Sequence, residues 1–228
     1  MANASDIEVL RELLAELRQT SVSHVTAATR PITPKVVFKL LVFREALYWR
    51  TLEFLEAAIC ELEANRFTSA LLLARALQEN VAANHYLSKR IQKAVKDDNC
   101  DFLDEDAMKL LLGARWEGHA YQAKNVIGFL DRVEKILPGF RGVYDGLSEF
   151  AHPNYSGVAL AFSKPKGEYG VELGAYPRDK SKLSSQAVAA LMGGIELYCI
   201  DYNSTAEYLH DLVQICYRDL ETNIRFEE

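Results

Sequence analysis

His152 ends the segment LSEFAH and is followed directly by proline and asparagine. Because Pro153 disfavours helical geometry in the residue before it, the short helix predicted over 140–152 is expected to stop at His152. A histidine in the last helical turn lies at the negative end of the helix dipole, a position suited to acid–base chemistry or to binding an anion. The same histidine also suits a structural role as a C-cap that bonds the last carbonyl groups, so both interpretations stay open.

A second group of polar residues lies on the helix predicted over 67–95, which is otherwise apolar nearly all round. Arg75, Gln78, Glu79 and Tyr86 follow helical spacings that place them in one stripe. Arginine and glutamate are seldom fully buried unless they are paired. Either Arg75 and Glu79 form a structural ion pair, or the stripe is one wall of a polar site inside a bundle.

The two groups are expected to meet. Tyr144, Ser148 and His152 are spaced i, i+4 and i+8 along one face of the short helix. Because a buried stripe with charged residues needs polar partners, we expect Arg75 and Glu79 to gather with these three around one polar pocket. The candidate catalytic residues are His152, Arg75 and Glu79. The candidate binding residues are Tyr144, Ser148, Asn154, Gln78 and Tyr86.

A metal site is a further interpretation, because Glu-x-x-His occurs at Glu149–His152 and again at Glu207–His210. Di-iron carboxylate bundles combine two such pairs with a glutamate from each of two other helices. The remaining ligands would come from Glu45, Glu53, Glu56 and Glu79. A glutamate on a separate helix between the two pairs is missing, so we expect neither a metal nor another cofactor.

Two short motifs carry a resemblance to a known group of proteins. The motif ARALQEN, with Arg-x-x-x-Glu, and the later Tyr-x-x-Leu-Ser-x-x-x-His-Pro-Asn resemble uncharacterised prokaryotic helical proteins related to the HEPN superfamily. As a helical pattern, the resemblance covers roughly residues 35–215. It implies a helical bundle, a homodimer and, in many relatives, RNA cleavage in toxin–antitoxin or phage-defence systems. Those RNases use a closely spaced arginine and histidine, whereas residues 142–151 separate Arg141 from His152 here.

Two classes of function follow from these residues. The first is a non-catalytic helical ligand-binding or interaction protein of the HEPN-like type, with a polar pocket inside the bundle. The alternative is a metal-independent HEPN-like RNase, in which His152 acts as acid or base and Arg75 stabilises phosphate charge. The formal net charge of −6 argues against a broad nucleic-acid-binding surface. We expect a homodimer whose ligand is a small molecule or RNA.

Composition and cysteine content limit the classes of protein to which the chain can belong. The 228 residues are 49% hydrophobic and 25% charged, as in ordinary globular proteins. The opening MANASDIEVLRELL lacks the pattern of a secretory signal, and no uncharged apolar run approaches the length that spans a bilayer. The four cysteines show neither C-x-x-C spacing nor a dense framework, which is typical of reduced thiols. We therefore expect a cytoplasmic protein that does not enter a membrane.

The elements that must position these residues are mainly α-helices, in a single helical domain over 1–228. Helical periodicity and helix-ending residues predict helices over 5–20, 35–64, 67–95, 104–137, 140–152 and 182–222. The runs GVALAFS and YGVELGA flank the polar turn KPKGE, which predicts a small β-hairpin within 157–175 or an ordered loop. The bundle would span 35–152, with the hairpin inserted before the last helix. Gly193 and Gly194 predict a close helix crossing or a kink in that helix.

Overall fold

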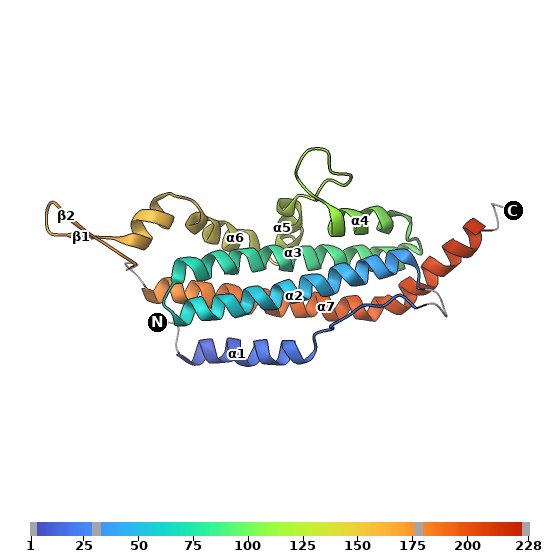
Figure 1. Ribbon diagram of the computed structural model, residues 1–228, viewed down its shortest axis with the longest axis horizontal. Coiled ribbons are helices and arrows are strands. Elements are labelled where there is room, and N and C mark those ends of the chain that lie inside the picture. The colour runs from blue at the N-terminus through green and yellow to red at the C-terminus, as the bar shows by residue number, and fades with distance from the viewer. Residues whose placement is uncertain (1–3, 29–32, 176–179, 225–228) are drawn as a thin grey trace. The chain divides into compact units, whose positions relative to one another are not determined.

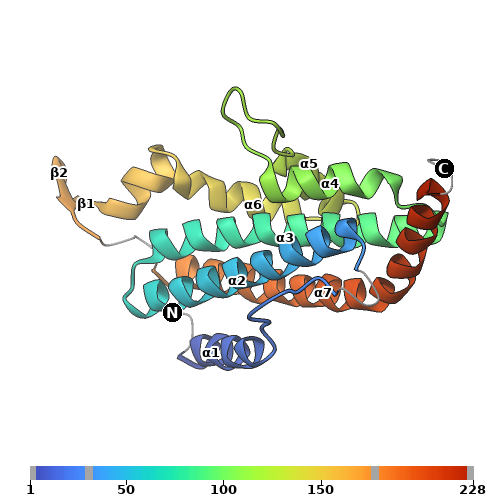
Figure 2. The same ribbon diagram turned by 45° about the vertical axis from the view of Figure 1, so that its right-hand side comes forward.

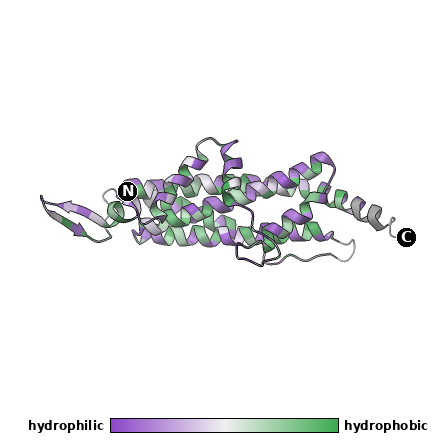
Figure 3. Cartoon of the chain, turned by 90° about the horizontal axis from the view of Figure 1, so that it is seen from above, coloured by the Kyte–Doolittle hydropathy of each residue, from purple (hydrophilic) through white to green (hydrophobic). Residues whose placement is uncertain are grey.

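The computed structural model describes residues 4–28, 33–175 and 180–224 (Figure 1). The protein is mainly helical (75%), and its helices pack as a bundle with a two-stranded hairpin before the final long helix, which confirms the predicted fold class. The α-helices are α1 (Ala4–Gln19), α2 (Lys35–Glu63), α3 (Phe67–Asp97), α4 (Asp101–Leu112), α5 (Val126–Glu134), α6 (Phe140–Ser148) and α7 (Lys180–Ile224). In Figure 3, hydrophobic and hydrophilic residues alternate along these helices, as expected of helices that bury one face.

The prediction of one helix over 104–137 is wrong, because an irregular loop separates α4 from α5. Gly113 ends α4 with extended backbone angles, and a Cβ atom at this position would lie 2.2 Å from the carbonyl oxygen of Lys109. The chain then returns through Ala114, whose N–H donates to the Tyr121 carbonyl at 3.0 Å. The Asn125 side chain accepts the N–H of Ile127 at 3.0 Å and so caps the start of α5.

The short helix that carries the candidate site ends close to where it was predicted to end. α6 stops at Ser148, and a 3₁₀ turn (Glu149–Ala151) continues it to the residue before His152. His152 itself has extended backbone angles (φ −98°, ψ 147°), as Pro153 demands of the residue before it.

The hairpin is shorter than predicted. Strands β1 (Ser163–Lys166) and β2 (Gly170–Leu173) pair antiparallel, with Ser163 opposite Leu173. The run GVALAFS was expected to form the first strand, but a π-helix (Tyr155–Leu160) occupies most of it. Asn154 explains the difference, because its side chain accepts the Gly157 N–H at 3.0 Å and its carbonyl accepts the Val158 N–H at 2.9 Å. A capped helical turn therefore replaces the strand.

The chain divides into two compact units, and α2, α3 and α7 each contribute one segment to each unit. Unit 1 comprises Met1–Thr20, Arg50–Val81 and Val133–Leu197, and unit 2 comprises Ser21–Trp49, Ala82–Arg132 and Tyr198–Glu228. A single domain over 1–228 stays a prediction.

Unit 1 holds its elements together through apolar packing and a few hydrogen bonds between helices. α1 contributes the buried Leu10 and Leu14, and the first half of α3 contributes a fully buried row that includes Leu71, Ala74 and Leu77. In Figures 1 and 2, α1 lies along the bundle below α2, and Arg11 of α1 bonds Glu63 of α2. The buried row belongs to the same part of α3 that carries Arg75, Gln78 and Glu79.

Unit 2 has its own hydrophobic core. Side chains from the first half of α2, the second half of α3, α4 and the end of α7 form one buried cluster. Its members include Val37, Leu87, Ile91, Leu103, Leu212 and Ile215.

α7 contains a long apolar stretch. Within Lys180–Arg218, an 18-residue window is long and apolar enough to cross a membrane by length and composition alone, and half of that window is buried in the fold. The core helix of a bundle passes the same test, so the expectation that the chain does not enter a membrane stays a prediction.

Candidate functional site

A cluster of four polar side chains joins α3 to α6 within unit 1. Arg75 donates from Nε to Ser148 Oγ at 2.8 Å and from Nη2 to Tyr144 Oη at 2.7 Å. Tyr144 Oη in turn donates to Glu79 Oε1 at 2.9 Å, and that carboxylate oxygen lies 3.3 Å from Arg75 Nη2. Ser148 Oγ donates to the carbonyl of Tyr144 at 2.9 Å. We call these residues, Arg75, Glu79, Tyr144 and Ser148, the α3–α6 cluster.

Helical spacing explains how the α3–α6 cluster forms. Arg75 and Glu79 are one turn apart on α3, and Tyr144 and Ser148 are one turn apart on α6, so each pair shares a helix face. The side chains of Arg75 and Glu79 retain exposures of 32% and 27%, whereas Tyr144 is buried. The partial exposure lets the ion pair form without the full desolvation cost of a buried pair.

The electrostatics of the cluster keep Tyr144 neutral. Burial raises the pKa of the Tyr144 phenol above its usual value, and the hydrogen bond to Glu79 raises it further, while Arg75 opposes both effects. A neutral phenol can donate to Glu79 while it accepts from Arg75, so one hydroxyl bridges the two charges. The arginine and the glutamate neutralise each other, and the cluster as a whole carries no net charge.

His152 is not part of this cluster. Its side chain is exposed, and within the described parts of the chain it forms neither a hydrogen bond nor an ion pair with Arg75 or Glu79. Its carbonyl accepts the N–H of Asn154 at 2.8 Å, which belongs to the turn that follows the 3₁₀ segment. The structure therefore brings together four of the five residues expected around one pocket.

Asn154 and Tyr86, two predicted binding residues, have structural partners elsewhere. Besides capping the π-helix, Asn154 donates from Nδ2 to the Glu149 carboxylate at 2.7 Å. Tyr86 belongs to unit 2, where its ring lies 4.6 Å from that of Phe129 and the ammonium of Lys124 lies 5.1 Å from its centre.

Gln78, the remaining predicted residue, is only 2% exposed and lies in the wall of a cavity of about 420 Å³ in unit 1. Its Nε2 donates to the Ala190 carbonyl at 2.7 Å, whereas its Oε1 is buried and has no hydrogen-bond partner among the described residues. An unpaired buried acceptor costs about 1–3 kcal/mol. The other walls are the segment from Leu137 to Val143 and the face of α7 that includes Gly193 and Gly194.

The close packing of α7 on α3 next to this cavity depends on Gly194. A Cβ atom there would lie 2.8 Å from Gln78 Nε2 and 2.9 Å from Leu77 Cδ2. Side chains of α3 therefore pack directly against Gly194, while a close helix crossing or a kink at the glycine pair stays a prediction. A Cβ atom at Gly193 would meet nothing within 4 Å, so this glycine leaves open space beside the cavity.

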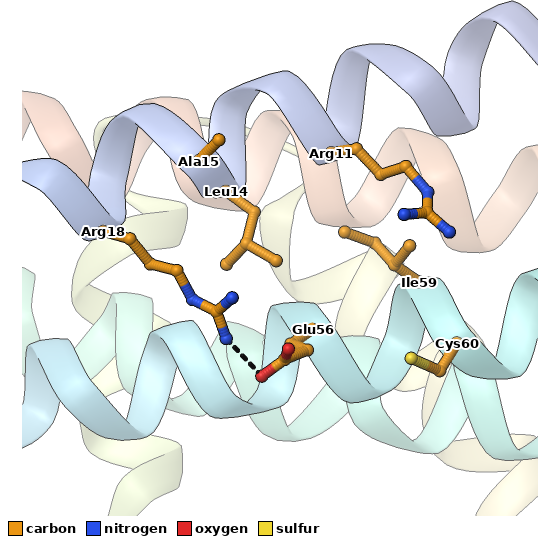
Figure 4. A pocket seen from close by; sticks show the side chains of 7 residues that line it. All are labelled: Arg11, Leu14, Ala15, Arg18, Glu56, Ile59 and Cys60. Carbon is orange, nitrogen blue, oxygen red and sulfur yellow. Dashed lines mark hydrogen bonds and ion pairs between the residues drawn. The ribbon is translucent and has the colours of Figure 1, made fainter.

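A second cavity of unit 1, about 390 Å³, lies between α1 and α2 (Figure 4). Figure 4 shows Arg11 and Arg18 reaching from α1 toward α2, where Arg18 pairs with Glu56 at 2.5 Å. Arg11 pairs with Glu63. Both pairs are substantially exposed, and a glutamate already meets each arginine, so we assign no function to this cavity.

Unit 2 contains buried polar groups of which the sequence analysis named only Glu45, as a possible metal ligand. His85 Nδ1 lies 2.9 Å from Asp201 Oδ2, and both side chains are almost fully buried. Arg44 pairs with Glu45 and stacks on the Tyr202 ring at 3.4 Å. Burial raises the pKa of the Tyr202 phenol well above its usual value, and its hydrogen bond to Glu45 adds to this. The available signal was a charged residue inside an apolar run, as in LLVFREALYW and ELYCIDYN.

Within the described parts of the chain, no three His, Cys, Asp or Glu side chains gather closely enough to hold a metal ion. The Glu149 carboxylate, which the metal interpretation would have used as a ligand, accepts a hydrogen bond from Asn154 instead. We therefore assign no metal site to these residues.

Comparison with known proteins assigns neither a family nor a function to this site. Neither family models, nor curated proteins, nor solved structures yield a match to the chain. The resemblance to HEPN-like proteins stays a proposal, and the helical fold is what the structure itself establishes.

Proposed function

We propose that this chain is a non-catalytic helical ligand-binding protein of the HEPN-like type, with its site in unit 1. The observation that carries the proposal is the cavity of about 420 Å³ beside Gln78. Small-molecule sites are concave, mostly apolar and roughly 300–1,000 Å³ in volume, with a few polar groups that orient the ligand. The cavity fits this description in size and in the character of its walls.

The α3–α6 cluster supports binding over catalysis. A nuclease needs an arginine free to stabilise phosphate charge and a histidine within reach of the reacting atoms. Here Arg75 already bonds Ser148, Tyr144 and Glu79, and its positive charge faces a carboxylate. His152 is exposed and lies outside the cluster.

The same cluster has a role in a binding protein, because it holds α6 in place. Phe140 and Val143 of α6 line the cavity, and Tyr144 directly follows Val143 in the chain. Bonds from Arg75 to Tyr144 and Ser148 therefore fix the cavity wall against α3. A wall held in one position before binding reduces the conformational entropy that the protein loses when a ligand binds.

Incubation with total RNA separates this proposal from the nuclease alternative. We expect purified wild type, His152→Ala and Arg75→Ala all to leave the RNA whole, with and without a chelator. Circular dichroism of each variant should match that of the folded wild type, which is the control for this experiment. Cleavage by wild type that both substitutions abolish, and that survives the chelator, would establish a metal-independent RNase and overturn the binding proposal.

A thermal-shift screen of small apolar molecules tests the binding site itself. A ligand that binds only the folded state raises the melting temperature, and the shift grows with the logarithm of the ligand concentration once this exceeds the dissociation constant. We expect hits for wild type to be lost in Gly193→Leu, because the new side chain fills open space beside the cavity. The matched control is Gly142→Leu on α6, where a Cβ atom also meets nothing within 4 Å but which does not line the cavity. Equal melting-temperature shifts in Gly193→Leu and Gly142→Leu would show that the ligand binds outside the cavity.

A further inference from the structure

The two edges of the hairpin differ in what they offer to a further strand. Within the described residues, β2 pairs only with β1, so each strand has one open edge. β1 carries Lys164, Pro165 and Lys166, and lysine and proline are residues by which proteins block an open edge. β2 contains neither residue type, and all four of its residues are exposed. Of the two edges, that of β2 is the one open to a further strand.

The hydrogen-bond pattern of the hairpin shows which groups lie on the open edge of β2. The Gly174 N–H donates to the Phe162 carbonyl at 3.0 Å. Because bonded and non-bonded positions alternate along an antiparallel ladder, the N–H and C=O groups of Leu173 and Val171 point away from β1. The nitrogen of Pro165, which lies opposite Val171, points away from β2 in the same way. β2 therefore presents backbone donors and acceptors at its open edge, whereas β1 presents a nitrogen without a hydrogen.

Apolar side chains accompany the open edge of β2. Val171 and Leu173 are 63% and 76% exposed and, being two residues apart, lie on one face of the strand. Tyr169, directly before β2, is 94% exposed. An isolated two-stranded hairpin is marginally stable in water, whereas three or more strands with an apolar face form a stable sheet. A further strand along β2 would bond the open backbone groups and cover part of these side chains.

The sequence of β2 is complementary to a second copy of itself. In an antiparallel pair with its twofold axis at Val171, this valine lies opposite its own copy, and Leu173 lies opposite Tyr169. Apolar and aromatic pairs at opposite positions stabilise a sheet. Glu172 then lies opposite Gly170, so like charges do not meet. An axis at Glu172 would place two glutamates opposite each other, which disfavours that register.

We propose that β2 of one protomer pairs antiparallel with β2 of a second copy, centred on Val171, and so forms a four-stranded sheet across a twofold dimer interface. The two β1 strands then form the outer edges of this sheet, where lysine and proline prevent the addition of further strands. Assembly therefore ends at two copies. The proposal is independent of the ligand-binding function, because no residue of β1 or β2 lines the unit 1 cavity.

Proline at position 171 tests the pairing on the full-length protein. Val171→Pro removes an N–H that does not bond β1, so the hairpin should persist while the dimer is weakened. Val171→Thr is the matched control, because it keeps the N–H and a side chain favoured in strands. Analytical ultracentrifugation should report dimers for wild type and Val171→Thr at micromolar concentration. The dissociation constant of Val171→Pro should be higher by about tenfold or more, as expected for the loss of hydrogen bonds at the interface.

Cysteine cross-linking tests the register without relying on the proline variant. In the proposed register the two Val171 Cα atoms are about 5.5 Å apart, within the range that a disulfide spans. The two copies of Lys164 lie on the outer strands, separated by three strand spacings of about 4.8 Å each, which is too far. With the exposed Cys60 replaced by serine, mild oxidation should therefore cross-link Val171→Cys and leave Lys164→Cys as separate chains.

Three results would overturn the proposal. The first is a wild-type particle of 25.7 kDa at micromolar concentration. The second is a Val171→Pro protein that dimerises as tightly as wild type, and the third is equal cross-linking of the two cysteine variants. Either of the last two would place the interface away from the open edge of β2.

Discussion

Arg75 is the residue on which the contact between α3 and α6 depends most. Its guanidinium bonds two side chains of α6 and pairs with Glu79 on its own helix. Arg75→Met should lower the free energy of unfolding by about 1–2 kcal/mol, because a methionine keeps the packing but loses these bonds. Urea denaturation followed by circular dichroism measures the change.

The control for this prediction is Arg11→Met in the same unit. Arg11 also bonds a glutamate on a neighbouring helix, but both side chains are largely in water, where such pairs contribute little. Arg11→Met should lower the free energy of unfolding by less than Arg75→Met does. Equal losses in the two variants would mean that the α3–α6 cluster contributes no more than a surface ion pair.

Asp106 makes the stability of unit 2 depend on pH. Burial opposes its ionisation, but hydrogen bonds from Lys124 and Arg90 outweigh burial and hold the pKa of this carboxyl below its usual value. A lowered folded-state pKa gives stability that is present above the unfolded value of about 3.9 and is lost as pH falls through the folded value. Asp106→Asn should therefore cost about 2 kcal/mol at neutral pH.

The difference between wild type and Asp106→Asn should shrink as pH falls below about 4, because the wild-type carboxyl is then protonated in the unfolded chain and becomes so in the fold. Free energies of unfolding measured from pH 7 to pH 3 check this. A difference that stays constant across the range would show that the ion pairs of Asp106 do not stabilise the fold through its charge.

At the scale of the helices, we expect the packing of α7 on α3 to be weakened by an added methyl group at Gly194 and to tolerate one at Gly193. Gly194→Ala places a methyl group within 3 Å of Gln78 and Leu77, which should cost about 1 kcal/mol or more despite the better helix propensity of alanine. Gly193→Ala meets no neighbour and should be neutral or stabilising by up to about 1 kcal/mol. Thermal unfolding of both variants compares them directly, and a Gly194→Ala protein as stable as Gly193→Ala would refute the close contact.

Helix periodicity was sufficient to locate α1, α2, α3 and α7, because each is long and has a regular apolar face. Periodicity did not predict the places where a single local contact determines where a helix begins or ends. Gly113 and the Asn125 cap break the stretch 104–137, and the Asn154 cap turns the start of the expected hairpin into helix. Such bonds involve single side chains that a periodic pattern does not register.

For the candidate site, spacing found the members of the α3–α6 cluster because i, i+4 pairs on two helices share a face. Spacing alone could not decide that Arg75 and Glu79 pair with each other and also bond side chains of α6. Nor could it find His85 and Asp201, which are 116 residues apart in the chain and meet only in the folded unit.

For the whole molecule, we predict self-association as a homodimer. The HEPN-like resemblance implies it, and apolar side chains of the hairpin give it a surface, since Val171 and Leu173 are 63% and 76% exposed. Light scattering at micromolar concentration should report a particle of about twice 25.7 kDa. The double variant Val171→Asp, Leu173→Asp should be folded and monomeric. A wild-type particle of 25.7 kDa would contradict the prediction.

The central claim, that the unit 1 cavity is a binding site, is tested most directly by a crystal structure of the protein soaked with a small apolar probe such as biphenyl. The account predicts one probe molecule in the cavity, against Phe140 and Val143. An empty cavity at saturating probe, or a probe bound only outside the cavity, would contradict the claim.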